Sequence, residues 1–413
     1  MNMARITVCA VVLSLGLALQ LSAGEQWPGF RGPTGDGQAA DANLPSEIAP
    51  GNVAWRVDIP GKGWSSPVIW GDQIWLTTAT EDGSEMSVIC RHLQDGRELF
   101  NRVLVRNEEP AFCHPMNSYA SPTPVIEAGR VYVHFGAYLT ACIDTNTFKL
   151  LWERRDLECD HHRGPASSPI LFDGKLFVAY DGFDQQYVLA LDKQTGETVW
   201  KRDREIDYGT DNGDLKKAYG TASVIHVDGK PLLIYPSAIA TIAYDVDSGD
   251  SVWITYHAGM NASARPVFVD GLVYIINGMG AMVAVRPDGT GDVTKTHVGW
   301  SSERAIAKKS SPIIVDGKLY MNSDDGIVTC RDAKSGELHW QERIGGKYAA
   351  SPIFAGGRIY CFGMDGEIVV FRPGDQFDLV SSTKLGDGFM ASPAVVGDTL
   401  ILRDKTGLFC VRR

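Results

Sequence analysis

Apolar and polar residues alternate over short stretches along the whole chain, and the same arrangement of stretches recurs. In the stretch SPIIVDGKLYM, Ile313 and Val315 alternate with other residues, Asp316-Gly317 follows, and Leu319 and Met321 alternate again. Alternation with period two predicts β-strands, and Asp-Gly supplies the positive φ of a tight hairpin turn. Each such stretch therefore predicts a two-stranded hairpin.

A second motif follows each hairpin at a regular distance. It reads small-x-Asp-x-x-x-Gly-x-x-x-Trp in its best copies, which are ALDKQTGETVW from Ala190, AYDVDSGDSVW from Ala243 and CRDAKSGELHW from Cys330. The small residue and the Asp belong to a third strand, Asp-x-x-x-Gly forms a turn, and the Trp lies on a fourth strand. Four antiparallel strands make one blade of a β-propeller.

Eight copies of this unit follow one another, and this number sets the architecture. Their first strands begin at Ser66, Ser121, Ser168, Ala222, Arg265, Ser311, Ser351 and Ser392. Self-similarity at this period is typical of a propeller, so we expect an all-β, eight-bladed β-propeller. The last unit ends without a fourth strand, whereas residues 52–57 form a lone Trp-bearing strand. The N-terminal strand is therefore predicted to complete the last blade, which leaves no sheet edge exposed.

Residues that repeat in register are predicted to be structural. The Asp of each turn accepts backbone amides, and the Trp residues pack between blades; the copies are Asp192, Asp245, Asp332, Trp152, Trp200, Trp253 and Trp340. Four cysteines occupy the small position of the third strand, where we expect buried thiols; they are Cys90, Cys142, Cys330 and Cys410. Cys361 falls on a second strand.

The first 24 residues have the pattern of a signal peptide. Arg5 precedes an apolar run from Ile6 to Leu21, and Ser22-Ala23-Gly24 supplies small residues for cleavage. The run is too short for a transmembrane anchor, and no Cys follows it, as a lipoprotein would require. We expect a signal peptide (1–24), an N-terminal extension (25–51) and one propeller (52–413), in a soluble monomer that is exported to the periplasm or beyond.

The net charge and the distribution of basic residues limit the classes of partner that the protein can bind. The formal net charge is −11, and no Lys/Arg cluster exceeds two adjacent residues. Duplex nucleic acid is therefore a poor partner, because its binding depends on concentrated positive charge. No nucleophile elbow, His-Glu-x-x-His or phosphate loop is present. The sequence thus contains no recognisable catalytic constellation, and it indicates that the protein binds a protein partner or a small ligand.

Candidate binding residues come from loops that are longer than the repeat requires. The long connections are 100–121, 152–168, 200–222 and the loop 181–186, which fall on one face and in one sector, over blades 1 to 4. Propeller function usually resides in such loops. Their candidates are His114, Asn117, Tyr119, His161, His162, Arg163, Asp184 and Tyr219.

Five further candidates lie near strand starts that approach the central channel, namely Trp64, Arg265, Lys309, Lys347 and Tyr348. Together with the loop candidates they predict a funnel-shaped ligand site. For Arg265, a structural contact inside the channel is the alternative to ligand binding.

The loops also contain cysteines and histidines for which the sequence allows alternative roles. Cys113 and Cys159 lie on neighbouring loops, so they either form a disulfide or stay free. A metal at the three loop histidines matches no known spacing of ligands, and the metal content is unknown.

The two motifs together resemble a known repeat. The small-x-Asp-x-x-x-Gly-x-x-x-Trp turn with its upstream Ser-Pro/Asp-Gly hairpin is similar, from 52 to 411, to the repeat of pyrroloquinoline quinone (PQQ) dehydrogenases and of the outer-membrane assembly propeller BamB. The stretch WPGFRGP from Trp27, together with 181–200, looks like exported PQQ-like propeller proteins.

The resemblance implies two different functions. PQQ dehydrogenases stack the cofactor over a disulfide between adjacent cysteines and bind calcium, but this chain has no Cys-Cys pair. BamB-like proteins are anchored by a lipid on an N-terminal Cys, which is also missing. We therefore expect a non-catalytic propeller that binds through the top-face loops of blades 1 to 4. The alternative is a quinone (PQQ)-dependent or metal-dependent oxidoreductase that uses the central funnel.

Overall fold

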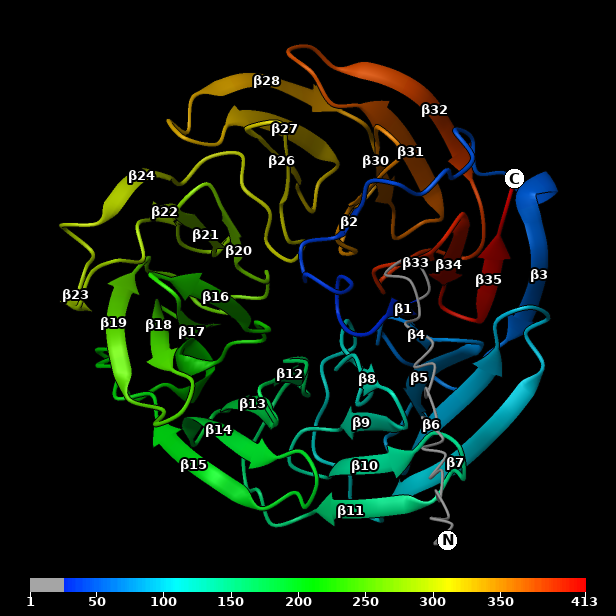
Figure 1. The fold of residues 1–413 in the computed structure, drawn as a ribbon, viewed down its shortest axis with the longest axis horizontal. Coiled ribbons are helices and arrows are strands. Elements are labelled where there is room, and N and C mark those ends of the chain that lie inside the picture. The colour runs from blue at the N-terminus through cyan, green and yellow to red at the C-terminus, as the bar shows by residue number, and fades with distance from the viewer. Residues whose placement is uncertain (1–25) are drawn as a thin grey trace, which may run out of the picture.

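Eight four-stranded sheets stand around a central axis in the computed structural model (Figure 1), which describes residues 26–413. The predicted signal peptide lies outside the described residues. Each blade is built from consecutive antiparallel strands, so the chain passes from one blade to the next around the ring. The eight-bladed propeller predicted from the repeats is therefore confirmed.

The first four blades follow the order of the chain. Blade 1 contains β4 (Val68–Trp70), β5 (Gln73–Ala79), β6 (Glu85–His92) and β7 (Glu98–Arg106). Blade 2 contains β8 (Val125–Glu127), β9 (Arg130–His134), β10 (Thr140–Asp144) and β11 (Leu150–Arg154). Blade 3 contains β12 (Ile170–Phe172), β13 (Lys175–Asp181), β14 (Gln186–Asp192) and β15 (Thr198–Asp203). Blade 4 contains β16 (Ser223–Val227), β17 (Lys230–Pro236), β18 (Ala240–Asp245) and β19 (Ser251–Tyr256).

The remaining blades complete the circle. Blade 5 contains β20 (Val267–Val269), β21 (Leu272–Ile276), β22 (Met282–Val285) and β24 (Val298–Ser302). The short β23 (Gly291–Asp292) leaves this blade and pairs with β19 of blade 4. Blade 6 contains β25 (Ile313–Val315), β26 (Lys318–Asn322), β27 (Ile327–Asp332) and β28 (Leu338–Arg343). Blade 7 contains β29 (Ile353–Ala355), β30 (Arg358–Phe362), β31 (Glu367–Arg372) and β32 (Asp378–Lys384).

Blade 8 joins the two ends of the ring. Its inner strands are β33 (Ala394–Val396), β34 (Thr399–Arg403) and β35 (Gly407–Val411), and β3 (Val53–Asp58) supplies the outer strand. Trp55 lies opposite Cys410, which repeats the pairing of Ala190 with Trp200 in blade 3. Figure 1 shows the blue β3 beside the red β35. The predicted closure by the N-terminal strand is confirmed.

Tryptophans on the outer strands hold neighbouring blades together. The Nε1 of Trp200 in blade 3 donates a hydrogen bond to the carbonyl oxygen of Val246 in blade 4, at 3.1 Å. A Cβ at Gly249 of that same turn would lie 2.6 Å from the Trp200 ring. Trp55 contacts blade 1 in the same way, through the carbonyl oxygen of Leu93. The repeated Trp is therefore a contact between blades, as predicted.

The other repeated residues also have structural roles. The carboxylate of Asp192 accepts the amides of Gln194 and Thr195, both at 2.8 Å. The hydrogen bond from the Thr195 amide is the largest of the effects that lower the pKa of this carboxyl. The four third-strand cysteines have no exposed surface, and burial raises the pKa of Cys142 to about 11. These thiols are buried, as predicted.

The Ser of four Ser-Pro pairs, at 168, 311, 351 and 392, has a role that the repeat pattern did not reveal. The amide of Ser311 donates to the hydroxyl of Ser351, and the amide of Ser351 donates to Ser392, both at 2.9 Å. These bonds join the first strands of successive blades around the channel. In blade 2 the residue at this position is Thr123, which accepts the Ser66 amide. The strand start assigned to Ser121 is corrected accordingly.

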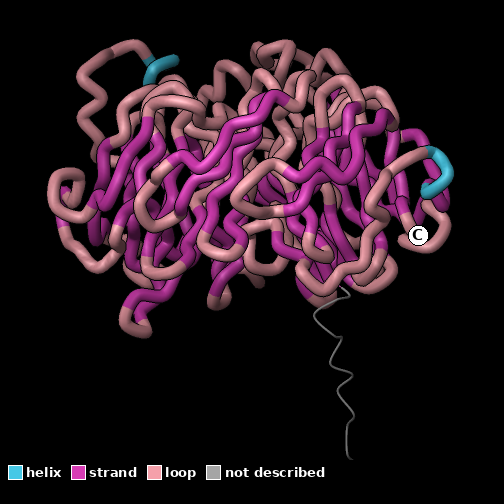
Figure 2. The backbone as a smooth tube through the Cα atoms, turned by 90° about the horizontal axis from the view of Figure 1, so that it is seen from above, coloured by secondary structure: helices cyan, strands magenta, loops and turns pink. Residues whose placement is uncertain are grey.

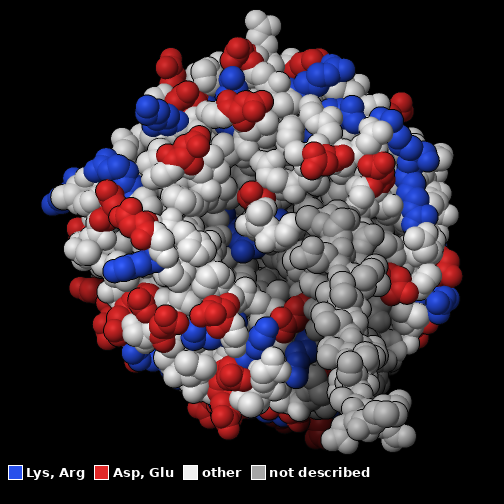
Figure 3. Space-filling model, in the orientation of Figure 1, with Lys and Arg blue, Asp and Glu red and all other residues white. Residues whose placement is uncertain are grey.

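The long connections rise from one face of the ring (Figure 2), and one of them carries the short helix η3 (Gly213–Lys216). Figure 3 shows the opposite face, where basic and acidic side chains are interspersed and the centre is hollowed. The segment before β3 crosses the middle of the ring (Figure 1). Within it, β1 (Gln26–Trp27) pairs with β4, β2 (Gln38–Ala39) pairs with β29, and the helix η2 (Pro50–Asn52) leads into β3.

Candidate binding cup

A cavity of about 340 Å³ opens at the centre of the ring. All eight blades or the connections between them contribute to its wall, and one residue comes from the segment before β3. The lining residues are Phe30, Trp64, Ser66, His114, Met116, Asn117, Ser121, Thr123, Arg163, Ala166, Ser168, Tyr219, Thr221, Asn261, Ser263, Met279, Lys308, Lys309, Ala349, Ser351, Met390 and Ser392. We call this cavity the cup.

The lower wall of the cup follows from the repeat itself. Each first strand begins beside the axis, so the hydroxyls that link the blades also line the cavity, as Thr123, Ser168 and Ser351 do. The oxygen of Ser168 accepts the Thr123 amide at 2.9 Å. The wall is consequently polar and held by hydrogen bonds between blades.

The upper wall combines apolar and cationic groups. Trp64 and three methionines contribute apolar surface, and Met116 and Met279 are 47% and 50% exposed. Methionine side chains adapt to the shape of a partner. Lys308 is exposed and contributes a cationic group, whereas Lys309 forms an ion pair with Asp324, and none of the lining residues is Asp or Glu. The cup therefore suits a ligand that is partly apolar and carries negative charge.

The predicted loop sector forms one side of the cup. Arg163 forms a bidentate ion pair with Asp214 of the next long loop, with N···O distances of 2.6 and 2.5 Å. This hydrogen-bonded contact raises the pKa of Arg163 and lowers that of Asp214. The carbonyl oxygen of Arg163 accepts the side-chain amide of Asn117 at 2.9 Å and the backbone amide of His114 at 3.3 Å. Three long loops are thus joined at one residue.

The channel candidates Trp64 and Lys309 line the cup, and so do four of the loop candidates, namely His114, Asn117, Arg163 and Tyr219. The Nδ1 of His114 accepts the Met116 amide at 3.2 Å. Asn117 is occupied on both sides of its amide, since its oxygen also accepts the Ser121 hydroxyl at 2.6 Å. Its role is to hold the loops, and the Arg163 guanidinium is likewise paired with Asp214, so His114 and Tyr219 are the better ligand contacts among the four.

Two candidates lie in the wall outside the cup, where Tyr119 is buried and His161 is half-buried. The Tyr119 hydroxyl donates to the carbonyl oxygen of Ala111 at 2.6 Å. The ring of His161 stacks on Tyr180 with 5.9 Å between centroids, and burial lowers the pKa of this histidine well below its usual value. A neutral histidine that packs against an aromatic ring stabilises the loop and does not reach the cavity.

Two other loop candidates lie at the outer rim. His162 packs between Phe112 and Phe183, with ring centroids at 5.8 and 5.0 Å. Asp184 accepts the backbone amide of Asp160 at 2.8 Å, which fixes the loop. The two phenylalanines are 57% and 38% exposed, so the rim carries an apolar patch beside the cup.

The other three channel candidates fall outside the cup. Arg265 is 9% exposed, and its guanidinium donates to the carbonyl oxygen of Phe30 and, at 3.1 Å, to the Ser223 hydroxyl. This is the structural alternative considered from the sequence. Lys347 is exposed on the surface, and Tyr348 is 1% exposed. Ala349 takes the place beside the cavity that Lys347 and Tyr348 were expected to fill.

In the described residues, the loop cysteines form no disulfide and the loop histidines belong to no metal-binding group. Cys113 and Cys159 are free thiols in the structure, and burial raises the pKa of Cys113 to about 11. Across residues 26–413, no three His, Cys, Asp or Glu side chains meet in a group that could hold a metal ion.

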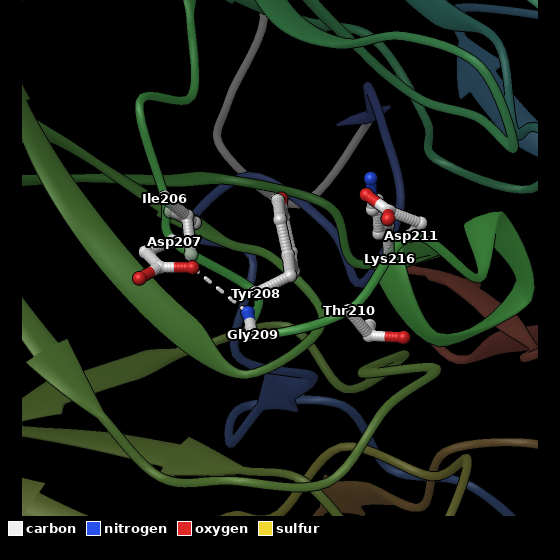
Figure 4. Close-up of a pocket in the computed structure, with 7 residues that line it drawn as sticks. All are labelled: Ile206, Asp207, Tyr208, Gly209, Thr210, Asp211 and Lys216. Carbon is white, nitrogen blue, oxygen red and sulfur yellow. Dashed lines mark hydrogen bonds between the residues drawn. The ribbon is translucent and has the colours of Figure 1, made fainter.

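A second hollow, of about 390 Å³, belongs to a single loop. Ile206, Asp207, Tyr208, Gly209, Thr210, Asp211 and Lys216 line it. Figure 4 shows these side chains spread along the loop, with one hydrogen bond among them, from the Gly209 amide to Asp207. One loop without a facing element makes a poor binding site, so we regard the cup as the candidate site.

Several lining residues escaped the sequence argument. Phe30, Met116, Met279, Lys308 and Met390 are separated by up to 360 positions along the chain. Met116 lies in the long connection 100–121 that loop length singled out, but no local signal marks an isolated Met or Lys as a lining residue. Only the closure of the ring brings them together.

A propeller of four-stranded blades with hydroxyl-lined first strands and a central cup defines a protein of the PQQ-like repeat class. Within the described part of the chain, no helix is both long and apolar enough to cross a membrane. The family model described as outer membrane protein assembly factor BamB matches residues 95–342 and 184–413. These ranges cover more than half of the sequence, and the chain belongs to this family.

Individual relatives are distant. The BamB of Yersinia pestis is 25% identical over 197 residues, which cover 44% of this chain and 48% of that protein. The tetrathionate hydrolase of Acidithiobacillus ferrooxidans is 23% identical over 333 residues, with 75% and 64% of the two chains covered. The chain thus spans about half the length of the BamB relative and somewhat less than two thirds of the hydrolase.

Solved structures show the same fold at lower identity. A europium-containing methanol dehydrogenase matches with a TM-score of 0.73 and 13% identity, covering 94% of this chain and 91% of its own. The BamB of Moraxella catarrhalis matches with a TM-score of 0.63 and 13% identity, covering 87% and 99%. At such identities the likeness concerns the propeller alone.

Proposed function

We propose that this protein is an exported, non-catalytic binding propeller whose cup receives a small ligand or a segment of a protein partner. The ligand portion that enters the cup is partly apolar and negatively charged. The observation that carries this proposal is the composition of the cup, in which Trp64 and three methionines lie beside the exposed Lys308 and no lining residue is Asp or Glu.

The apolar rim supports a protein as partner. Phe112, His162 and Phe183 form an exposed cluster next to the cup, and exposed apolar patches commonly mark interaction sites. The name of the BamB relatives, outer membrane protein assembly factor, agrees with a protein-binding role. Export is supported by the N-terminal signal-peptide pattern.

The alternative is a quinone-dependent or metal-dependent oxidoreductase, as the methanol dehydrogenase fold suggests. Calcium and related hard cations require several carboxylate or carbonyl oxygens. The cup offers hydroxyls, thioethers and cationic groups and no lining Asp or Glu. These residues do not fit a PQQ–calcium pair in the manner of the dehydrogenases, so we derive no redox step.

A thermal-shift titration tests the proposal. Straight-chain alkyl sulfonates combine an anionic head with an apolar tail, and tetrathionate serves as a wholly polar anion. A ligand that binds only the folded state raises the melting temperature with concentration. We expect the sulfonates to do so in the wild type and to lose affinity in Lys308→Ala and Trp64→Ala.

The matched control is Lys334→Ala, which removes an exposed lysine from a turn on the opposite face. Equal affinities in the control and in the cup variants would refute the proposed site. A parallel absorbance titration with PQQ and calcium addresses the alternative, since a saturable spectral change would favour the oxidoreductase.

A further inference from the structure

The segment before β3 passes through the central channel. It starts at blade 1, where Gln26 and Trp27 pair with β4, and ends at blade 7, where β2 lies parallel to β29. Between these anchors the carbonyl oxygen of Pro28 accepts the Ile126 amide of blade 2 at 2.8 Å. Residues 26–39, which we call the plug, therefore link blades 1, 2 and 7 beside the axis of the ring.

Two arginines fix the plug in the channel. Arg31 is 1% exposed and donates to the carbonyl oxygens of Pro312, at 2.7 Å, and Pro352, at 3.4 Å. Arg265 of blade 5 donates to the carbonyl oxygen of Phe30. One arginine thus reaches from the plug to the ring and the other from the ring to the plug. Charge-assisted hydrogen bonds are stronger than neutral ones.

Close packing at Gly35 shows that the fit is specific. A Cβ at this position would lie 2.2 Å from the Cζ of Arg265, and the residue has a φ of +75°. Both features require glycine, because a side chain would displace the guanidinium and strain the backbone. The plug is therefore shaped to the channel and does not merely lie against it.

The position of Phe30 connects the plug to the cup. Phe30 is half-buried and is the one plug residue that lines the cavity. We call the hydrogen bonds that Arg31 and Arg265 make between the plug and the ring the latch. We propose that Phe30, which the latch holds in place, forms the floor of the cup and limits the length of the ligand that fits. This inference rests on the proposed binding function and assigns Phe30 as a residue that determines ligand length.

The first experiment tests the latch without any ligand. The amides of Ile126 and Phe354 donate to Pro28 and Gly37 of the plug, so their hydrogen exchange reports plug attachment. We expect slow exchange in the wild type and fast exchange in Arg265→Ala and Gly35→Ala. Arg403→Gln is the matched control, because Arg403 is also buried and donates to carbonyl oxygens of the ring, away from the plug.

If the two amides stay protected in both latch variants, or lose protection equally in the control, the latch is refuted. Exchange at amides within β13 and β14 shows in the same data whether each variant remains folded.

The second experiment measures the longest tail that the cup accepts, with a series of alkyl sulfonates whose tails differ by one methylene. Each methylene buried in the cup should raise affinity about fourfold, until the tail meets Phe30. In Phe30→Ala the gain should continue for additional methylenes before it stops. Phe377→Ala, which removes an aromatic ring packed on Trp340 outside the cup, should keep the wild-type limit.

The outcomes separate the two proposals. An unchanged length limit in Phe30→Ala refutes the floor but leaves the binding function standing. Failure of the wild type to bind any member of the series refutes the proposed ligand class, and amide exchange then decides whether the plug is latched as described.

Discussion

The contact between Trp200 and Gly249 offers a sharp test of how neighbouring blades are held. Trp200 is 6% exposed, packs 5.7 Å from the ring of Phe177 and donates to the carbonyl oxygen of Val246. Removing a large buried aromatic side chain costs about 3–5 kcal/mol. The lost hydrogen bond is part of that cost, at about 1 kcal/mol. Trp200→Ala should therefore lower the free energy of unfolding by about 4 kcal/mol.

Gly249→Ala perturbs the same contact from the other blade. Its φ is +74°, and its Cβ would lie 2.6 Å from the Trp200 ring. The left-handed backbone costs about 1–2 kcal/mol, and the overlap adds about 1–3 kcal/mol. Gly271→Ala is the matched control, because Gly271 has a φ of +78° with open space around its Cβ. It should show only the backbone cost.

A double-mutant cycle in urea measures the coupling. Once Trp200 is replaced by Ala, Gly249→Ala should cost no more than Gly271→Ala, which gives an interaction energy of about 1–3 kcal/mol. Additive effects of the two substitutions, or a loss below about 1 kcal/mol for Trp200→Ala, would refute the assigned contact between the blades.

Three further predictions follow from the same structure. Burial raises the pKa of Cys330 and Cys410 to about 11. At neutral pH a thiol reagent should therefore label these cysteines only after denaturation. Rapid labelling in the native protein would contradict their assigned strand positions. Hydrogen bonds from backbone amides lower the pKa of Asp192, Asp245 and Asp332 below 3.8, so their stabilising effect is present above pH ~4 and is lost as the pH falls through the folded-state pKa. Asn substitutions at all three should flatten the acid side of the stability–pH curve, and an unaltered curve would argue against these turns as the cause. Arg163→Ala should weaken binding in the cup, because its ion pair with Asp214 joins two loops of the wall, and should lower the free energy of unfolding by about 1 kcal/mol. Arg202→Ala, which removes an exposed ion pair on an outer strand, should leave binding unchanged.

The blades could be predicted from the sequence because their determinants are local. Alternation along 313–321, the Asp316-Gly317 turn and the Asp-x-x-x-Gly turn each act within about a dozen residues. The lone strand around Trp55 and the incomplete last unit predicted the closure, since every Trp-bearing strand in the repeat needs three partners. The shift of the blade 2 start from Ser121 to Thr123 arose because two Ser/Thr-Pro pairs stand in succession there.

The candidate site was only partly predictable. Loop length pointed to the sector that contains His114, Arg163 and Tyr219. It could not distinguish these residues from His161, whose ring packs on Tyr180, because neighbours on an irregular loop point in directions that its contacts decide. Arg265 was recognised as unusual at its repeat position, but its contact with Phe30 joins residues 235 positions apart.

The sequence by itself determined the repeat, the number of blades, the residues that hold the blades together and the strand that closes the ring. Each of these depends on short-range backbone geometry copied eight times. The tertiary structure alone decided that Phe30, Met279 and Lys308 share one cavity and that 26–39 pass through the channel. Such contacts form only when the ring closes. The rotation from each blade to the next, added over eight blades, brings these distant residues to the axis, and no local sequence pattern does so.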